Sequence, residues 1–266
     1  REERDMDFTF GIIGGSGMLG HAIATGLLKA HAVPPERLWI SNRSGVAAGF
    51  EAWPGITVTR DNSKLAEACD VILLCVPPAL AGEVGVSAPD KLVMSVMAGV
   101  DLDRLTELTG AARVVRAMSS PAAALGLAFS PWIASPAVTS DDRARVTQLF
   151  GSIGKAAEVT TEDHIVLFTA MTGPVPGFVA YFAQCMADYA EARGVPAEIA
   201  DVATRQLFLS AGQMMYEGQT PATHVEWMVD YDGTTAAGLR AMQASSIASE
   251  IAKGLDAAVE RTRSIG

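Results

Sequence analysis

The sequence of 266 residues has few cysteines, few aromatic residues and no excess of positive charge. Its three cysteines, Cys69, Cys75 and Cys185, form no Cys-x-x-Cys or Cys/His cluster, which argues against a disulfide framework and a structural zinc site. The four histidines are scattered without metal-ligand spacing, so no metal is expected. The formal net charge of −10 argues against the basic face of a nucleic-acid-binding protein.

Long apolar runs are also missing. No run reaches the roughly 18 residues that a membrane-spanning helix needs, so no membrane partner is expected. The charged segment Arg1–Asp7 lacks the apolar core of a signal peptide, and we expect a cytoplasmic protein. Whether residues 1–5 are native is left open, because Arg1 is not a natural start.

What is present is the composition of a globular protein, with 49% hydrophobic and 19% charged residues. In residues 1–158, short apolar runs alternate with helical stretches, which predicts an α/β fold with a Rossmann-type doubly wound sheet. The run Val71–Val76, bounded by Asp70 and Pro77, is typical of a strand buried on both faces. The expected strands are Phe8–Ile13, Leu38–Ile40, Ile56–Val58, Val71–Val76, Leu92–Val96 and Arg113–Ala117.

The pattern changes after about residue 160, where strand-like runs end. The expected helices are Glu162–Thr172, Gly177–Arg193, Pro196–Tyr216, Thr220–Val229 and Thr234–Thr262. They carry apolar residues on more than one face, which a small domain does not bury alone. We therefore predict that residues 159–266 form an all-helical dimerisation domain of a homodimer, with further assembly left open. Packing of these helices only against one another is the alternative.

A glycine-rich segment, Gly15-Ser16-Gly17-Met18-Leu19-Gly20, matches Gly-x-Gly-x-x-Gly between an expected strand and an expected helix. The first glycine would allow the tight turn, the second the approach of a pyrophosphate, and the third close packing of helix and strand. The start of the helix would then bind the phosphates. This predicts a dinucleotide site at Gly15–Leu19; a glycine-rich turn without a ligand is the alternative.

The end of the second expected strand indicates which dinucleotide binds. An NAD-binding protein usually has an acidic residue there, whereas this chain has Ser41-Asn42-Arg43-Ser44. Arg43 can pair with a 2′-phosphate, with donors from Ser41, Asn42 and Ser44, so NADP(H) is preferred over NAD(H). A solvated loop arginine is the alternative. Further cofactor-binding residues are expected at the ends of the fourth and fifth strands, namely Cys75, Val76, Pro77, Ala98 and Gly99.

Several segments together resemble the signatures of pyrroline-5-carboxylate reductases. They are Ser41–Ser44, Cys75–Pro78, Ser95–Val100, Val115–Met118 with Pro121, Ala170–Phe178 and Gly233–Leu239. The resemblance covers essentially the whole chain in the same order. It implies a Rossmann domain followed by a helical dimerisation domain, with the active site between the cofactor and the helices of two subunits. It also implies hydride transfer from NAD(P)H to the C=N bond of a cyclic imine.

The resemblance further implies which residues act on a small-molecule substrate. A hydroxyl at the position of Thr235 bonds near the imine nitrogen, and backbone N–H groups at the start of that helix hold the substrate carboxylate. The substrate-binding residues implied are Gly173, Asp230, Asp232, Gly233 and Thr234. From the residues alone, helix capping is the alternative for the two threonines, and Asp232 is a candidate N-cap of the last helix.

The chain departs from the family pattern where the substrate is expected. Asp230 and Asp232 place two negative charges near the expected carboxylate site, and Pro174 and Pro176 lack backbone N–H donors. The resemblance implies an NADPH-dependent reductase of pyrroline-5-carboxylate, and these departures extend the expectation to a close analogue. The alternatives are a related NADP oxidoreductase acting on another imine or a deazaflavin, and a non-catalytic NADP-binding regulatory dimer. The first expected domain also resembles the opening of NADP-dependent deazaflavin oxidoreductases at Gly11–Gly17.

Overall fold

A computed structural model of the protein describes residues 7–216 and 218–265, so residues 1–6 of the charged N-terminal segment lie outside the described residues. By its internal contacts the chain divides into two units. The first unit runs to Pro174 and includes the end of the chain from Ala258. The second, the helical unit, is Val175–Ala257. The predicted boundary after residue 158 falls where the last strand ends, and it stays a prediction.

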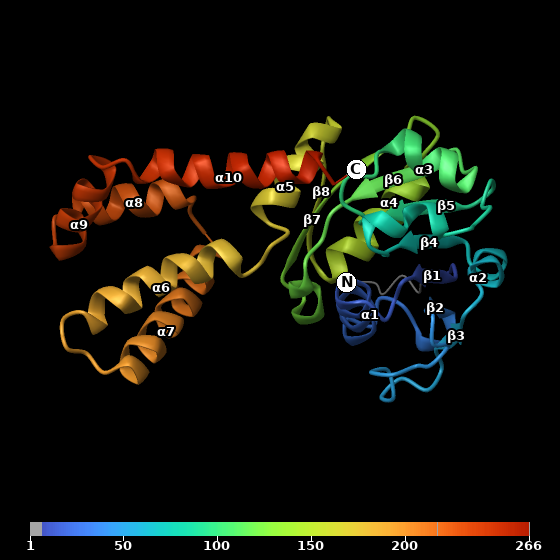
Figure 1. Cartoon of the computed structure of the whole chain (residues 1–266), viewed down its shortest axis with the longest axis horizontal. Helices are drawn as coiled ribbons and strands as arrows, with labels where there is room; N and C mark the ends of the chain where they lie inside the picture. Colours follow the sequence, from blue (N-terminus) through green and yellow to red (C-terminus); the bar gives the residue numbers. More distant parts are fainter. Residues whose placement is uncertain (1–6, 217, 266) are drawn as a thin grey trace. The chain divides into compact units, whose positions relative to one another are not determined.

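In the described residues of the first unit, one 8-stranded sheet has the order β3-β2-β1-β4-β5-β6-β7-β8 (Figure 1). Each neighbouring pair is parallel except β6 and β7, which are antiparallel. The strands are β1 (Phe10–Ile13), β2 (Leu38–Ser41), β3 (Thr57–Thr59), β4 (Val71–Leu74), β5 (Leu92–Ser95), β6 (Arg113–Ala117), β7 (Ala128–Ala134) and β8 (Gly154–Glu158). Since β1 lies between β2 and β4, the strand order changes direction there. Ligands of such sheets bind outside the carboxyl ends at this point.

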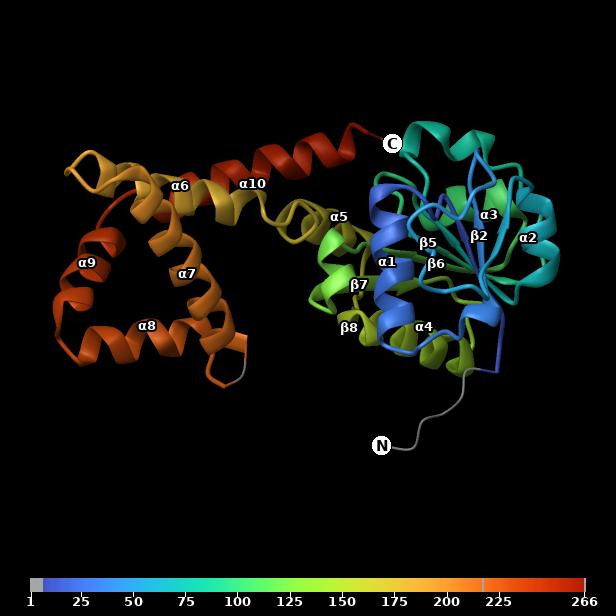
Figure 2. The same ribbon diagram turned by 90° about the horizontal axis from the view of Figure 1, so that it is seen from below.

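Helices cover both faces of the sheet in the first unit (Figures 1 and 2). Alternate residues of β1 and β4 belong to different clusters: Ile12 and Leu73 pack with α1 and α4, while Ile13 and Leu74 pack with α2 and α3. The sheet is therefore buried on both sides, as the apolar run at Val71–Val76 predicts. The helices are α1 (Met18–Lys29), α2 (Asn62–Ala68), α3 (Leu102–Thr109), α4 (Ser140–Ser152) and α5 (Glu162–Met171), with 3₁₀ turns η1 (Pro35–Arg37), η2 (Pro78–Glu83) and η3 (Pro121–Leu125).

Two strands were not expected from the sequence. β7 contains Pro131, which cannot donate to a ladder, and β8 reads Gly-Lys-Ala-Ala-Glu without an apolar run. Both nevertheless pair over most of their length. Their position at one side of the sheet, with β8 at its edge, explains why weak strand sequences suffice there.

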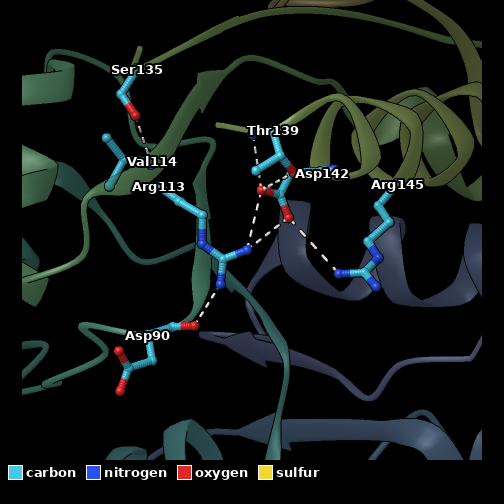
Figure 3. Close-up of polar contacts among 7 residues, drawn as sticks. All are labelled: Asp90, Arg113, Val114, Ser135, Thr139, Asp142 and Arg145. Carbon is cyan, nitrogen blue, oxygen red and sulfur yellow. Dashed lines mark hydrogen bonds and ion pairs between the residues drawn. The ribbon is translucent and has the colours of Figure 1, made fainter. Parts of the chain in front are cut away.

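A buried ion pair fixes α4 to the start of β6 (Figure 3). Asp142 is 1% exposed, and its two carboxylate oxygens accept hydrogen bonds of 2.9 and 3.1 Å from Nη1 of Arg113. Thr139, the N-cap of α4, exchanges reciprocal bonds with Asp142. Burial raises the pKa of Asp142, but the bonds from Thr139 and Arg113 outweigh it and hold that pKa below its ordinary value. The negative charge of the buried Asp142 carboxylate is therefore paired with hydrogen-bond donors of the same unit.

The helical unit contains the remaining described helices. They are α6 (Gly177–Glu191), α7 (Ala197–Tyr216), α8 (Pro221–Asp230), α9 (Thr234–Gln243) and α10 (Ile247–Arg263), whose last residues belong to the first unit. There Thr262 is buried, and Nη2 of Arg263 lies 3.5 Å from Oδ1 of Asp163.

The single helix expected at Thr234–Thr262 is wrong, because the structure has a break between α9 and α10. Ser245 causes it locally: its hydroxyl donates to the Met242 carbonyl and accepts from the Ile247 N–H. Such side-chain bonds compete with the helical ladder and favour a helix end.

The helical unit leaves its apolar side chains largely exposed. Among its described residues only Ala200 and Ala236 are buried. The exposed apolar residues include Val179, Tyr181, Ile199, Val202, Leu207, Leu209, Met214, Met215 and Trp227. Among the described helices of the chain, none is long and apolar enough to cross a membrane. This apolar surface agrees with the prediction that these helices do not complete a core alone.

Candidate functional site

A cleft of about 490 Å³ lies at the carboxyl ends of β1, β2, β3 and β4, where the strand order changes direction. Its volume is in the range of ligand sites. Its residues come from the glycine-rich turn, the segment after β2, the segment after β3 and the segment after β4. They are Ile13, Gly14, Ser16, Gly17, Ser41, Asn42, Arg43, Ser44, Arg60, Asn62, Cys75, Val76, Pro77, Leu80, Glu83 and Val84.

The glycine-rich turn is built differently from the sequence expectation. The residue in the left-handed region is Gly14, with φ +85, and not Gly15. A Cβ at Gly14 would lie 2.5 Å from the carbonyl oxygen of Cys75, the residue that follows β4, so only glycine fits there. Gly15 faces β2 instead, since its Cβ would lie 2.7 Å from Cγ2 of Ile40.

The last glycine has the role that the motif predicts. A Cβ at Gly20 would lie 2.5 Å from the Gly14 carbonyl oxygen, so glycine lets α1 start against the turn. Gly17 is the N-cap of α1, with φ −70, and its Cβ would meet only the Gly14 carbonyl oxygen, at 3.3 Å. Neither an unusual backbone nor a severe contact requires glycine at this position of the cleft. The motif predicts close approach of a pyrophosphate to the backbone at Gly17, and this stays a prediction.

The segment after β2 is held by its own polar groups. Nδ2 of Asn42 donates to Oγ of Ser16 at 2.6 Å, which joins this segment to the glycine-rich turn. Oδ1 of Asn42 accepts bonds from the Gly45 N–H and the Ser44 hydroxyl. The Ser41 hydroxyl bonds to the Asn62 amide oxygen. These side chains therefore hold the loop in its shape. The guanidinium groups of Arg43 and Arg60 remain as charged donors to a ligand.

Two arginines line this side of the cleft, Arg43 and Arg60. Arg60 directly follows β3, and its Nε donates to the Ser44 carbonyl at 2.8 Å. Arg43 was predicted from the sequence, whereas Arg60 was not. Its place follows from the parallel pairing of β3 with β2, which brings the end of β3 beside the segment after β2.

Cys75 lines the cleft but is not a nucleophile. Burial raises the pKa of its thiol to about 12, so it stays protonated and unreactive near neutral pH. Cys69 behaves in the same way, since burial and the neighbouring Asp70 charge raise its pKa to about 12. Among the described residues, no group of three or more His, Cys, Asp and Glu is arranged to hold a metal ion.

The predicted cofactor residues divide into two sets. The cleft brings together Ser16, Gly17, Asn42, Arg43, Ser44, Cys75, Val76 and Pro77. The residues that do not line it are Gly15, Met18, Leu19, Ala98 and Gly99. Met18 is 80% exposed at the start of α1, so only its backbone N–H belongs to the helix end that faces phosphates in such folds.

Most of the predicted substrate residues lie where α8 ends and α9 begins, in the helical unit. Asp230 ends α8, Gly233 is the N-cap of α9, and Thr234 and Thr235 form its first turn. The N-cap interpretation of Asp232 is wrong, because Asp232 precedes the cap with φ +56. Its carboxylate instead accepts a 2.6 Å bond from Nη1 of Arg240.

Gly173, the remaining predicted substrate residue, belongs to the first unit and follows α5. A Cβ there would lie 2.5 Å from the Thr169 carbonyl oxygen. Packing against the preceding helix therefore accounts for this glycine without a ligand.

Comparisons with known proteins cover both parts of the chain. Residues 9–99 match the family model "NADP oxidoreductase coenzyme F420-dependent", and residues 162–265 match "pyrroline-5-carboxylate reductase dimerisation". The chain is 31% identical over 266 residues to the pyrroline-5-carboxylate reductase of Pisum sativum, covering 97% of this chain and 96% of that protein. It is 28% identical over 269 residues to that of Escherichia coli, covering 98% and 99%.

Solved structures show the same architecture. A pyrroline-5-carboxylate reductase from Coxiella burnetii has a TM-score of 0.88 at 26% identity, covering 98% of this chain and 99% of that chain. The pyrroline carboxylate reductase of Plasmodium falciparum, solved with NADP bound, has a TM-score of 0.81 at 24% identity, covering 98% of both chains. At 24% identity, the similarity to the Plasmodium falciparum structure supports the fold alone.

Proposed function

Because the chain belongs to the pyrroline-5-carboxylate reductase family, whose members are NAD(P)H-dependent oxidoreductases acting on C=N bonds, we propose that it reduces pyrroline-5-carboxylate or a closely similar cyclic imine with NADPH. The observation that carries the proposal is the cleft at the strand-order change, with its glycine-rich turn and its two arginines. Full-length similarity to pyrroline-5-carboxylate reductases supports the reaction class.

The cleft fits a dinucleotide phosphate chemically. Gly17 leaves the backbone accessible at the start of α1, where N–H groups without helical partners attract phosphate. Arg43 and Arg60 supply positive charge at the other side, next to the segment that binds the adenosine ribose in such folds. The acidic residue that would select NAD is missing after β2. These features support NADPH in preference to NADH.

Bound NADPH would supply the hydride that reduces the carbon of the C=N bond. The chain would supply orientation and a hydrogen-bond donor to nitrogen. We assign that donor to the Thr235 hydroxyl in the first turn of α9. The N–H groups of Gly233, Thr234 and Thr235 at the same helix start would hold a carboxylate. We assign Cys75 no role in proton transfer, because a thiol whose pKa burial raises to about 12 is a poor acid and forms little thiolate near neutral pH.

Arg240 changes how the acidic substitutions around the substrate residues are interpreted. The charge of Asp232 is balanced by Arg240, whose Nη2 also donates to the Val229 carbonyl at 3.3 Å. Only Asp230 then adds an exposed negative charge next to the start of α9. We propose that the carboxylate of the substrate is tolerated because one of the two acidic side chains is already neutralised.

We further propose that the working unit is a homodimer formed through the helical unit. The exposed apolar side chains of α6 and α7 support it, as does the match of residues 162–265 to a dimerisation family. Burial of these side chains would supply the driving force for association.

The test is oxidation of NADPH at 340 nm by the full-length chain with pyrroline-5-carboxylate. Turnover is expected, with a Thr235→Ala variant reduced in kcat by about 10- to 100-fold, as for the loss of one hydrogen bond to a charged group, and Thr235→Ser largely active. Absence of turnover across pyrroline-5-carboxylate, 1-pyrroline and a six-membered imine carboxylate would overturn the proposal. An unchanged kcat in Thr235→Ala would contradict only the assignment of the Thr235 hydroxyl as the hydrogen-bond donor to the imine nitrogen.

Asp230 supports one second candidate, an imine without a carboxylate. Its negative charge at the end of α8 would favour a neutral or cationic substrate over an anionic one. The same assay distinguishes the two: the second candidate requires a higher kcat/KM for 1-pyrroline than for pyrroline-5-carboxylate, reversed by Asp230→Ser.

A further inference from the structure

Arg60 reaches the cleft from a strand that the glycine-rich motif does not include. It follows Thr59, the last residue of β3, and β3 pairs with β2 in parallel. The carboxyl ends of these strands therefore lie side by side, which places Arg60 next to Ser44. Arg60 and Arg43 line the same cleft, although 17 positions separate them in the sequence.

The structure holds the Arg60 side chain in a defined position. Its Nε donates to the Ser44 carbonyl at 2.8 Å. Gly45 has φ +68, and a Cβ there would lie 2.9 Å from Cγ and 3.0 Å from Nε of Arg60. Glycine at this position therefore leaves the space that the arginine occupies. With Nε bonded to the loop, the two terminal nitrogens remain as the bidentate donors of the guanidinium.

The other polar side chains of this region are already bonded within the protein. Ser41 bonds to Asn62, Asn42 bonds to Ser16 and Gly45, and Ser44 bonds to Asn42. A phosphate monoester carries about −1.5 to −2 charges at neutral pH, which one guanidinium does not balance. Glu83 is the acidic residue lining the cleft, and it lies at the end of η2, away in sequence from both arginines.

We propose that Arg60 is a second determinant of NADP(H) specificity, and that it clamps the 2′-phosphate of the cofactor together with Arg43. The inference rests on the proposed preference for NADPH. It assigns the discrimination to two guanidiniums from neighbouring strand ends, and it gives Asn42 and Ser44 the role of shaping the loop. Arg60 thereby determines which cofactor binds, whereas the hydride-transfer chemistry is common to both.

The test is calorimetric binding to the full-length protein without imine substrate. The ligands are NADP⁺ and NAD⁺, and the fragments 2′,5′-ADP and 5′-AMP, which differ by the 2′-phosphate. The variants are Arg60→Gln, Arg60→Lys and Arg43→Gln. The matched control is Arg104→Gln, an exposed arginine of α3 in an ion pair with Glu107.

Arg60→Gln is expected to raise the Kd for NADP⁺ and for 2′,5′-ADP by about 10- to 100-fold, as for the loss of a charged hydrogen bond. The Kd for NAD⁺ and 5′-AMP is expected to change less than about 3-fold. Arg60→Lys should recover part of the loss, because it restores the charge without the bidentate fork. Added salt should weaken NADP⁺ binding more in the parent protein than in Arg60→Gln.

Two results would overturn the inference on Arg60. One is an Arg60→Gln variant that binds NADP⁺ as tightly as Arg104→Gln does. The other is an equal loss of NADP⁺ and NAD⁺, which would mean that Arg60 acts on a part common to both cofactors. A parent protein that binds NAD⁺ as tightly as NADP⁺ would instead overturn the proposed cofactor preference, so the two failures are distinguishable.

Discussion

The first unit buries many of its apolar residues, whereas the helical unit leaves most of its apolar residues exposed. The first unit encloses two apolar clusters, one on each face of its sheet. In the helical unit only Ala200 and Ala236 of the described residues are buried, and leucines such as Leu209 are exposed. The first unit therefore has its own core, whereas the helical unit has helices without one. The difference indicates that the helical unit depends on a partner for its stability.

The same contrast holds for charge. In the first unit the carboxylate of Asp142 is 1% exposed and receives bonds from Arg113 and Thr139. In the helical unit the Asp232–Arg240 pair has side chains that are 70% and 54% exposed. An ion pair with a buried carboxylate is shielded from water on one side, whereas a pair with both side chains exposed is screened by water.

The largest effect is expected from a charge on the exposed apolar surface of the helical unit. Leu209→Arg should raise the Kd for self-association by about 100-fold or more, because an unpaired charge would enter the dimer interface that we propose for the helical unit. The matched control is Leu127→Arg in the first unit, since the two leucines are 67% and 63% exposed. Sedimentation equilibrium measures both. An equal Kd for self-association in the two variants would contradict the contrast between the two units.

A smaller but still large effect is expected in the first unit from Asp142→Asn. Loss of the buried charge should lower the free energy of unfolding by about 3 kcal/mol at pH 7, measured by chemical denaturation. The neighbouring Asp141, exposed in the first turn of α4, is the control, and Asp141→Asn should change it by less than about 0.5 kcal/mol.

The stability difference should also depend on pH. Since the pKa of Asp142 is lowered in the folded state, its stabilisation is present above the unfolded-state value of about 3.9 and is lost as pH falls through the folded value. The gap between the parent and Asp142→Asn should therefore close below about pH 4. A gap that stays constant through that range would show that the carboxylate charge is not the cause.

The smallest effect is expected from Asp232→Asn in the helical unit. Its exposed pair with Arg240 should contribute less than about 1 kcal/mol to the free energy of unfolding. The measurement is denaturation at fixed protein concentration, so that dimerisation contributes equally. A loss as large as that of Asp142→Asn would contradict the contrast between buried and exposed ion pairs.

The sequence predicted those parts of the fold in which local pattern and burial agree. The strands β1, β4 and β5 are apolar runs with both faces buried, so composition alone indicates them. β7 and β8 were missed, because Pro131 and the polar Lys155 and Glu158 are tolerated only through pairing near a sheet edge. Pairing between distant segments leaves no local signal.

The site follows the same rule. The motif indicated the turn, but the left-handed position is Gly14, because the contact that requires glycine comes from Cys75, the residue that follows β4. Arg60 was missed, since its place beside Ser44 follows from strand order and not from spacing. The preference for Asp at helix N-caps favoured the wrong interpretation of Asp232, whose carboxylate instead pairs with Arg240 of α9.

The return of the chain's end to the first unit has a consequence during protein synthesis. Thr262 is buried there and Arg263 lies beside Asp163, so the first unit receives its last residues only after the helical unit has been translated. A nascent chain stalled before Ala258 would lack these contacts and would also carry unpaired apolar helices. The incomplete first unit and the exposed apolar helices of such a product would favour its degradation over its accumulation.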